Sequence, residues 1–337
     1  MISEEPLLEA GYAVARQQFT LQGYRFPSAD DVIAAAAPQK GLVESPIQVD
    51  SMRACYTIAA NGVSITVNRW TGALDYVDLD GKPLLQEGYS VTPNFWRAPT
   101  DNDYGAQLQN KFAAWKNPVL KTKSVKCYPV GSAQAIQVLY EMPSVNGQLT
   151  LTYTMNAQGE FAVRQQLLAD EKQKDSHMLR YGMQWVMPKQ FSHITYYGRG
   201  PVENYIDRCG DALLGVYESE AGKEYWPYVR PQESGNHIDV RYWKVADASG
   251  RGLTFLATGP MECSTLNYLP EDLDDGPNKA AHQSHSGDLV PRDFSVLQIQ
   301  QRQFGVGCVN SWGAWPRPEY RLNYVGRDFT YIVKATR

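Results

Sequence analysis

The stretch Leu149-Thr150-Leu151-Thr152-Tyr153-Thr154-Met155 alternates apolar and hydroxyl-bearing side chains without a break. Successive side chains of a β-strand point to opposite faces of a sheet, so the four apolar residues fall on one face and the three threonines on the other. This period of two residues predicts a half-buried strand. Its apolar face packs against a core, and its threonine face meets solvent or a second layer.

Turn-forming dipeptides recur between short strand-like runs. The clearest are Asn61-Gly62, Asp80-Gly81, Asn146-Gly147 and Gln158-Gly159. Such pairs suit tight hairpins because both turn positions require a positive φ angle. A turn signal about every ten residues favours an antiparallel sandwich over a sheet of alternating strands and helices. The sequence therefore predicts an all-β fold.

Two segments depart from this pattern. Gln107–Trp115 carries Leu108, Phe112 and Trp115 at helical spacing and predicts one short helix, which Pro118 ends. Residues 1–46 hold one predicted strand, Gly11–Leu21, followed by a stretch rich in proline, serine and alanine that is typical of a connection. One strand is too little for a domain. This region either pairs with something outside the sequence or packs on the main body as an extra edge.

Composition excludes several classes of function. The chain has 337 residues, of which 43% are hydrophobic, enough for two domains or one large β unit. The 32 basic and 36 acidic residues leave a net charge of -4, which removes nucleic acid and anionic membranes as default partners. No run approaches the roughly 18 consecutive apolar residues of a membrane span. Met1–Pro6 lacks the features of a secretion signal, so a cytoplasmic location is favoured if Met1 is the native start.

Cysteine and histidine spacing offers no metal or redox site. The five cysteines lie far apart, are odd in number and form no CxxC pair, which favours free thiols in a reduced compartment. The five histidines include no HExxH frame. We therefore expect no metal and no cofactor in this chain.

Four segments combine polar, aromatic and turn residues more densely than ordinary strands do, and each is a candidate loop. They are NFWRAPTDNDYG (94–105), YGRGPVENYIDR (197–208), YVRPQESGNH (228–237) and FGVGCVNSWG (304–313). In this order they closely resemble the C-terminal domain of the β-galactosidases of glycoside hydrolase family 2, and the separately encoded small subunit of some bacterial β-galactosidases. The resemblance runs from about Ser45 to Arg337, and Gly11–Phe19 resembles the end of the preceding immunoglobulin-like domain.

The resemblance implies a division into two parts and a fold. Residues 1–46 would be the C-terminal strand of that immunoglobulin-like domain plus a linker, and residues 47–337 the small-chain domain. The fold implied is a large antiparallel supersandwich like that of galactose mutarotase, which agrees with the period of two residues described above.

The resemblance also implies a function that the chain does not perform alone. Retaining glycosidases need two carboxyl groups roughly 5 Å apart, and in this family both are glutamates on a separate (β/α)₈ barrel. We therefore assign no catalytic residue and expect the isolated chain to be inactive. Its expected partners are the barrel domain or large subunit and the aglycone sugar of a β-galactoside such as lactose.

Two site residues follow from the resemblance alone. The tryptophan of the family's Ser-Trp motif is Trp312 here, and it would project into the mouth of the barrel as a platform for the aglycone sugar. An aromatic face suits the apolar C–H face of a pyranose ring. Cys308-Val309 stands where relatives commonly have Gly-Asp. The stretch that begins at Gly105 would be a mobile loop beside the active site, with glycine supplying the φ freedom of a hinge.

Several carboxylates allow more than one interpretation. Asp101 and Asp103 fit a turn with local hydrogen bonds better than a catalytic or calcium site. Glu203 and Asp207 are either members of a charge network that fixes their loop or a catalytic pair four residues apart. The resemblance favours the network because the family keeps its chemistry elsewhere.

Two rival functions remain open at this point. Glu233 and His237 could serve as the base and acid of an aldose epimerase-like enzyme. The other rival is a stand-alone carbohydrate-binding module. Turnover of α-galactose by the isolated chain would favour the first, and binding to immobilised sugars without the barrel would favour the second.

Overall fold

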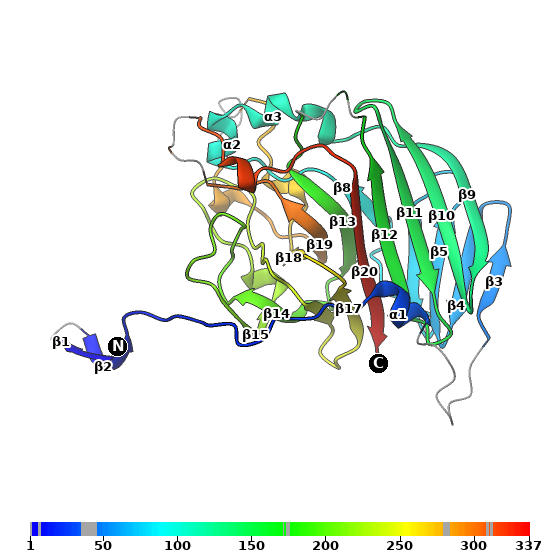
Figure 1. Ribbon diagram of the computed structural model, residues 1–337, viewed down its shortest axis with the longest axis horizontal. Helices are drawn as coiled ribbons and strands as arrows, with labels where there is room; N and C mark the ends of the chain where they lie inside the picture. Colours follow the sequence, from blue (N-terminus) through cyan, green and yellow to red (C-terminus); the bar gives the residue numbers. More distant parts are fainter. Residues whose placement is uncertain are drawn as a thin grey trace.

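The computed structural model describes every residue except 1, 6–7, 35–45, 171, 173–175, 279–283, 308–309 and 311–312, and for 2–5, 8–11 and 34 it describes the backbone only. Within this part the strands form three antiparallel sheets and one separate hairpin (Figure 1). The predicted all-β class is confirmed.

The largest sheet has nine strands and spans the whole molecule. Their order across the sheet is β15 (Leu213–Glu220), β14 (His193–Gly200), β16 (Tyr242–Ala246), β17 (Gly252–Ala257), β20 (Arg327–Thr336), β12 (Phe161–Leu168), β11 (Gly147–Met155), β10 (Ala133–Met142) and β9 (Lys121–Val130). β20 is the last strand in the sequence but lies in the middle of the sheet, between β17 and β12. The C-terminal strand therefore joins the two halves.

Two smaller sheets cover the inner face of the nine-stranded sheet. The five-stranded sheet has the order β3 (Gln48–Ser51), β4 (Cys55–Ala60), β5 (Val63–Asn68), β6 (Leu74–Leu79) and β7 (Lys82–Pro83). The four-stranded sheet has the order β18 (Glu262–Leu266), β19 (Phe294–Gln303), β13 (Arg180–Pro188) and β8 (Thr92–Asn94). The five-stranded sheet lies behind β9–β12 in Figure 1, and the four-stranded sheet lies beside it.

Helices are short and few among the described residues. The α-helices are α1 (Ala29–Ala34), α2 (Asp101–Gly105) and α3 (Leu108–Lys111). The 3-10 helices are η1 (Ala113–Trp115), η3 (Ala221–Lys223), η4 (Pro270–Leu273), η5 (Ser286–Asp288) and η6 (Pro318–Tyr320).

The predicted strand at Leu149–Met155 and the predicted hairpin turns are confirmed. In β11 the four apolar residues are fully buried and the three threonines only partly so. Asn61-Gly62 joins β4 to β5 and Asp80-Gly81 joins β6 to β7, with positive φ at all four residues. The hairpin β10–β11 turns at Asn146, whose φ is 53°.

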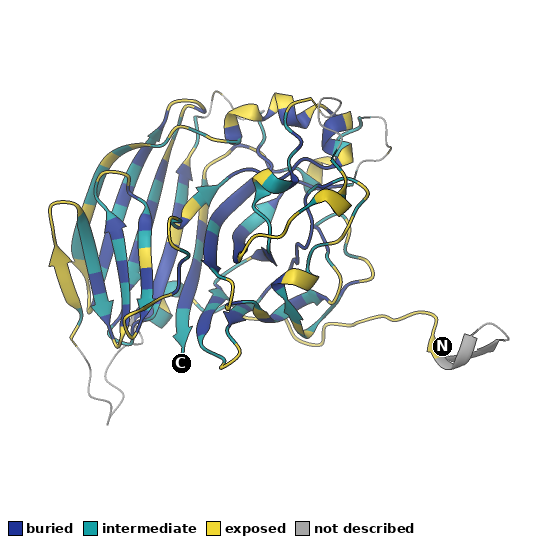
Figure 2. Cartoon of the chain, turned by 180° about the vertical axis from the view of Figure 1, so that it is seen from behind, coloured by how far each residue is buried: buried dark blue, intermediate teal, exposed yellow. Residues whose placement is uncertain are grey.

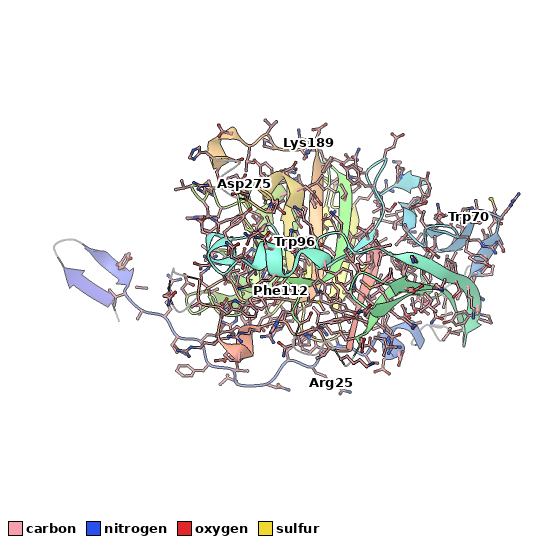
Figure 3. The ribbon with its side chains drawn as sticks, turned by 90° about the horizontal axis from the view of Figure 1, so that it is seen from above. Arg25, Trp70, Trp96, Phe112, Lys189 and Asp275 are labelled. Atoms are coloured by element: carbon pink, nitrogen blue, oxygen red, sulfur yellow. The ribbon has the colours of Figure 1, made fainter. Side chains whose placement is uncertain are left out.

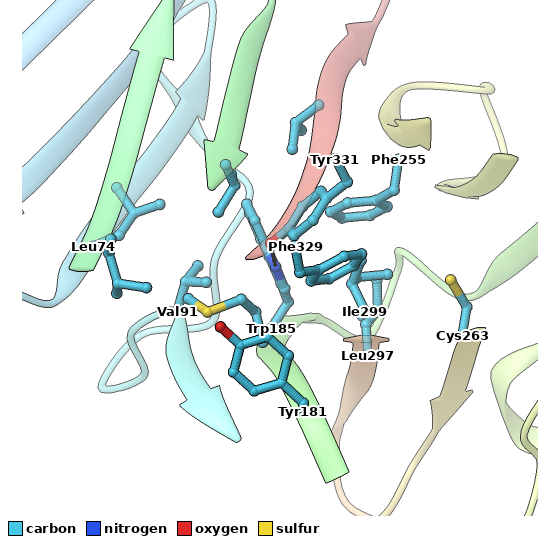
Figure 4. Packing of buried hydrophobic residues seen from close by; sticks show 14 of the residues in the cluster. Leu74, Val91, Tyr181, Trp185, Phe255, Cys263, Leu297, Ile299, Phe329 and Tyr331 are labelled. Carbon is cyan, nitrogen blue, oxygen red and sulfur yellow. Dashed lines mark hydrogen bonds between the residues drawn. The ribbon is translucent and has the colours of Figure 1, made fainter. Parts of the chain in front are cut away.

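One hydrophobic core lies between the sheets. It contains residues of β10, β11 and β12 facing β4, β5 and β6, and residues of β17 and β20 facing β13 and β19. Figure 4 shows the second region, where Trp185 donates a hydrogen bond from Nε1 to the Tyr331 hydroxyl at 3.0 Å. Buried residues follow the inner strands, and exposed residues concentrate in the turns (Figure 2).

The N-terminal segment differs from the prediction. The expected strand Gly11–Leu21 ends at Ala13, where β2 (Leu8–Ala13) stops pairing with β1 (Ile2–Glu5). Beyond it Gln18 pairs with the edge strand β15 through its side chain instead of its backbone. Its amide donates from Nε2 to Leu214 O and accepts from Leu214 N, both at 2.8 Å.

The rest of this segment lies across the outer face of the nine-stranded sheet. Tyr24 contacts Tyr197 of β14 edge to face, and the Arg241 guanidinium lies over the Tyr24 ring. In α1, Ile33 is buried against Ala133 and Ala162. Residues 18–34 thus pack on the main body. A domain boundary at residues 46 and 47 stays a prediction.

The predicted helix Gln107–Trp115 is broken into pieces. Leu108, Phe112 and Trp115 are all buried, as the spacing indicated. However, Gln107 adopts a left-handed conformation with φ of 60°, and Phe112 separates α3 from η1 with φ of -108°. The spacing therefore predicted the buried residues correctly, but the backbone conformations of Gln107 and Phe112 divide the predicted helix.

Candidate functional site

The four candidate loops meet at one end of the four-stranded sheet and are bonded to one another. We call the described parts of 94–105, 197–208, 228–237 and 304–313 the motif-loop cluster. Glu233 N donates to Ala98 O at 3.2 Å and links the third segment to the first. Side-chain hydrogen bonds also link the second segment to the third, and the fourth segment to the first and second. Residues far apart in the sequence therefore form one continuous structure.

A buried ion pair anchors the first segment. Arg97 is inaccessible to solvent, and its guanidinium donates to both carboxylate oxygens of Asp103 at 3.0 and 2.8 Å. It also donates to the carbonyl oxygens of Phe304 and Gly305. Burial is the largest effect and lowers the pKa of Arg97, but the combined attraction of Asp103, Glu233 and Asp207 outweighs it and leaves this pKa raised. Asp103 is therefore structural, as its local sequence favoured.

Asp103 also caps the N-terminus of α2, a helix that lies where the sequence predicted a loop. Thr100 Oγ1 accepts from Asp103 N at 3.1 Å, and Asp103 Oδ2 accepts from Thr100 N at 2.9 Å. This reciprocal pair is a capping box, which satisfies two backbone donors at a helix N-terminus. The threonine and aspartate three residues apart were the sequence signal that could have revealed this helix.

The fourth segment is held by side chains from the first and second. Asp207 accepts from the backbone N–H groups of Val306 and Gly307 at 3.1 and 2.9 Å. Asn102 donates from Nδ2 to Val306 O at 2.9 Å. Together with Arg97, these contacts fix the chain immediately before the segment that carries Trp312.

Glu203 joins the second segment to the third. Its carboxylate accepts from Gly235 N at 2.7 Å and from the Tyr228 hydroxyl, and it pairs with Arg208. Burial is the main reason that the pKa of Tyr228 is raised to about 12, with the neighbouring Glu203 adding to it. Glu203 and Asp207 thus bind different partners. This arrangement agrees with a charge network that fixes these loops.

A second set of polar contacts joins the second and third segments to strands β18 and β19. Asn204 N donates to Asn236 O at 2.7 Å, and Asn236 Nδ2 donates back to Asn204 O at 3.0 Å. Asn236 accepts from Gln300 Nε2 at 2.7 Å and lies 3.4 Å from the buried Glu262 carboxylate. Burial raises the pKa of Glu262 to about 8, although Arg302 opposes this rise. No pattern in the sequence indicates this buried acid.

Glu233 and His237 are each paired with a different ionisable side chain. Glu233 Oε1 lies 2.5 Å from the buried Arg180 Nη2, whereas His237 Nε2 lies 2.7 Å from Glu224 Oε2. The cavity beside Glu233 and Arg180 measures about 20 Å³. That volume holds about one water molecule, whereas ligand pockets measure roughly 300 to 1,000 Å³. The cavity beside Glu233 therefore lacks room for a sugar.

Gly105 and Gly313 bring the two predicted site segments together. Gly105 ends α2 and is exposed, and a Cβ atom added to Gly313 would lie 2.5 Å from the Gly105 carbonyl oxygen. Trp312 and Cys308-Val309 lie outside the described residues. The platform role of Trp312 and the mobility of the Gly105 loop both stay predictions.

Large apolar side chains are exposed on and beside the motif-loop cluster. Val202 and Val229 belong to two of its segments, and Trp226 donates its backbone N–H to Ser234 Oγ at 2.7 Å. Their exposed fractions are 45%, 78% and 55%. The exposed Trp70 lies at one end of the molecule, away from the buried Trp96 of the first segment (Figure 3).

The described part of the chain offers neither a cluster of metal ligands nor a helix that could cross a membrane. No three His, Cys, Asp or Glu side chains there lie close enough to hold a metal ion. Of the helices described, none combines the length and apolar character needed to cross a membrane. The four cysteines that the structure describes, Cys55, Cys127, Cys209 and Cys263, are free thiols.

The fold and the linked loops define a large antiparallel β-supersandwich module with a structured loop cluster at one end. The family model of the β-galactosidase small chain matches residues 59–334. The chain belongs to this family. A β-galactosidase of Priestia megaterium is 30% identical over 323 residues, covering 95% of this chain and 29% of the relative. One of Lactobacillus delbrueckii subsp. bulgaricus is 31% identical, covering 76% of this chain and 24% of the relative.

The chain thus spans less than a third of the length of these relatives. Among solved structures, a galactose mutarotase related enzyme of Lactobacillus acidophilus has a TM-score of 0.46 and 7% identity, covering 84% of this chain and 97% of that chain. An α-galactosidase of Geobacillus stearothermophilus has a TM-score of 0.41 and 10% identity, covering 84% of this chain and 40% of that chain.

Proposed function

We propose that this chain is the non-catalytic C-terminal portion of a β-galactosidase and that it completes the aglycone side of an active site carried by a separate barrel. In this role the chain contributes an aromatic wall and a docking surface. The two carboxyl groups that cleave the β-galactoside belong to the barrel. The chain alone then binds no substrate productively.

The observation that carries this proposal is the mutual bonding of the four segments. Arg97, Asn102 and Asp207 fix residues 304–307 through side-chain bonds to the backbone. A loop that presents one tryptophan to another domain needs such support, because a displaced platform loses its contact with the sugar. The cluster supplies this rigidity.

The exposed apolar residues supply a second argument. Val202, Trp226 and Val229 border the same loops that the sugar would approach. Apolar and aromatic side chains exposed together are typical of an interaction surface. Docking through this surface would place the Trp312 segment against the barrel.

The first experiment uses the chain alone. We expect no hydrolysis of nitrophenyl β-galactoside and restoration of hydrolysis when a catalytic large fragment is added. The reason is that this proposal assigns both catalytic carboxyl groups to the barrel. Hydrolysis by the purified chain alone, abolished by Glu203→Gln, would overturn the proposal.

The second experiment tests Trp312 in the restored enzyme. Trp312→Ala should raise KM for lactose roughly 5- to 150-fold, since an aromatic contact with a sugar is worth about 1 to 3 kcal/mol. KM for nitrophenyl galactoside should rise less, and inhibition by free galactose should stay nearly constant. Trp70→Ala is the matched control, because Trp70 is exposed at the opposite end of the molecule (Figure 3). If both KM values and the inhibition constant of galactose change by the same factor, the substitution has disturbed folding or docking.

A further inference from the structure

The outer face of the nine-stranded sheet carries a groove of about 880 Å³, and no residue of the motif-loop cluster lines it. Its floor is formed by β10, β11, β12 and β20. Helix α1 forms one wall, and the β9–β10 turn together with residues 258–260 forms the others. The volume falls within the range of natural ligand sites, roughly 300 to 1,000 Å³.

The walls distinguish this groove from an ordinary solvated sheet face. α1 lies on the sheet at β12 and β20 (Figure 1), and its Ile33 is buried against Ala133 and Ala162. Asn156 Nδ2 also donates to Val32 O in α1 at 3.4 Å. The helix is therefore fixed to the sheet and converts a flat face into a concave one.

Polar side chains form an unbroken row across the floor. Gln137 of β10 lies opposite Thr152 of β11, Thr152 lies opposite Arg164 of β12, and Arg164 lies opposite Thr330 of β20. Neighbouring strands are about 4.8 Å apart, a spacing close to the length of one pyranose ring. A chain of sugars laid across the strands would meet one polar side chain at each ring.

The charges in the groove nearly cancel. Arg164 donates from Nε to Asp328 Oδ1 at 3.0 Å and pairs with the same carboxylate through Nη2. Gln166 donates to Asp328 Oδ2 at 3.1 Å and holds this carboxylate in place. Asp30 is the one further charged side chain among the lining residues. The groove thus suits an uncharged ligand with many hydroxyl groups better than a phosphate or another polyanion.

The backbone of the floor argues against an extended peptide as the occupant. β10, β11 and β12 are each paired on both sides, so their N–H and C=O groups are already used. A peptide that adds a strand needs a free sheet edge. Hydroxyl and amide side chains remain for recognition, and the half-buried Tyr128 at the margin offers an aromatic surface to a sugar ring.

We propose that this groove binds a neutral oligosaccharide of several sugar units and holds it without cleaving it. The inference rests on the groove residues and does not require the proposed β-galactosidase role. A site on this face would retain a glycan near the molecule while the motif-loop cluster remains available for docking.

The test is calorimetric titration of the 337-residue chain with β-1,4-linked galactotetraose, and with galactose for comparison. We expect the tetrasaccharide to bind with a Kd of roughly 1 mM or below and galactose to bind at least about tenfold more weakly, because one ring meets fewer groups of the row. Gln137→Ala and Thr152→Val should each weaken tetrasaccharide binding by about tenfold.

Thr66→Val is the matched control, since Thr66 is a half-buried threonine on the separate five-stranded sheet. It should leave binding unchanged, and substitutions at such surface positions seldom disturb folding. An absence of binding heat, an equal loss in Thr66→Val, or preferred binding of tetralysine would overturn the proposal. The Gln137 variant should keep wild-type kinetics with lactose in the restored enzyme, which separates this site from the proposed aglycone side.

Discussion

The backbone of Gly313 packs directly on the backbone of Gly105, so that a Cβ atom at position 313 would lie 2.5 Å from the Gly105 carbonyl oxygen. Gly313 also has a φ of 91°, which disfavours any side chain. The contact joins the segment that carries Trp312 to the end of α2. Both segments are the ones that the sequence connected with an active site.

Gly313→Ala should therefore destabilise the loop for two reasons, backbone strain and a steric clash. Gly250→Ala is the matched control, because Gly250 has a φ of 89° and nothing within 4 Å of its added Cβ. Strain alone costs about 1 to 2 kcal/mol, and the clash should add about 1 to 3 kcal/mol at position 313. Urea denaturation of both variants measures the difference. Equal losses of unfolding free energy in the two variants would show that Gly313 is not in tight contact with Gly105.

The Arg97–Asp103 pair should be important for folding. Asp103→Asn leaves a fully buried guanidinium without its counter-ion, and such a loss costs about 3 to 5 kcal/mol. The exposed pair Lys123–Glu141, with Nζ and Oε2 3.2 Å apart, provides the comparison. Glu141→Gln should cost no more than about 1 kcal/mol. Similar free energies of unfolding for the two variants would mean that the carbonyl groups of Phe304 and Gly305 suffice for Arg97.

Glu262 should make stability depend on pH. Its pKa is about 8 in the folded chain, against an ordinary value of 4.5. Between these values the folded state holds a proton that the unfolded state releases, so the free energy of unfolding should fall as pH rises, by about 1.4 kcal/mol per pH unit from this group. Below pH 4.5 and above pH 8 its contribution should be constant.

Glu262→Gln removes this titration while keeping the shape of the side chain. Unfolding measured at intervals from pH 4 to pH 9 should give a flatter profile for the variant than for the wild type. The difference should be confined to the window between the two pKa values. Parallel profiles would show that Glu262 keeps its charge in the folded state.

Trp226 should contribute to docking on a catalytic large fragment. Buried tryptophans are frequent energetic centres of interfaces, where their loss costs about 2 kcal/mol or more, so Trp226→Ser should weaken assembly about 30-fold. Trp70→Ser is the control, because Trp70 is even more exposed and lies at the other end of the molecule. Assembly is measured by titrating the large fragment and following restored hydrolysis. The assignment fails if both variants assemble equally well.

The N-terminal segment should stabilise the main body from residue 18 onward. A chain lacking residues 1–17 should keep its stability. A chain lacking residues 1–34 loses the contacts of Tyr24 and the buried Ile33, and burial of one such side chain is worth about 1.5 to 3 kcal/mol. Thermal unfolding of both truncated chains tests this expectation. A matching loss for the two truncations would place the stabilising contacts before residue 18.

Local patterns were sufficient for the strands and turns. The alternation from Leu149 to Met155 predicted the buried face of β11, because side-chain direction in a strand depends only on position along it. Asn61-Gly62 and Asp80-Gly81 predicted their hairpins, because the turn itself demands positive φ. The prediction of one helix over Gln107–Trp115 was less accurate. The left-handed conformation of Gln107 interrupts the helix, and the spacing of apolar residues does not reveal such an interruption.

The same reasoning failed where partners lie far away in the sequence. Gly11–Leu21 was predicted as a strand, but a strand needs a neighbour, and beyond Ala13 only the Gln18 side chain finds one on β15. Likewise Glu203 and Asp207 could be considered a catalytic pair because they are four residues apart. Their actual partners, Gly235 and Val306, are 32 and 99 residues further along.

By itself, the sequence determined the all-β class, the positions of the turns, the family and the four segments that matter, because each depends on local periodicity or on contiguous motifs. Only the tertiary structure decided that those segments bond to one another, that Arg97 and Glu262 are buried, and that α1 closes a groove on the outer sheet face. These features depend on which surfaces meet when the sheets pack. Burial, ion pairing and concavity arise from contacts between distant residues, and no local pattern specifies such contacts.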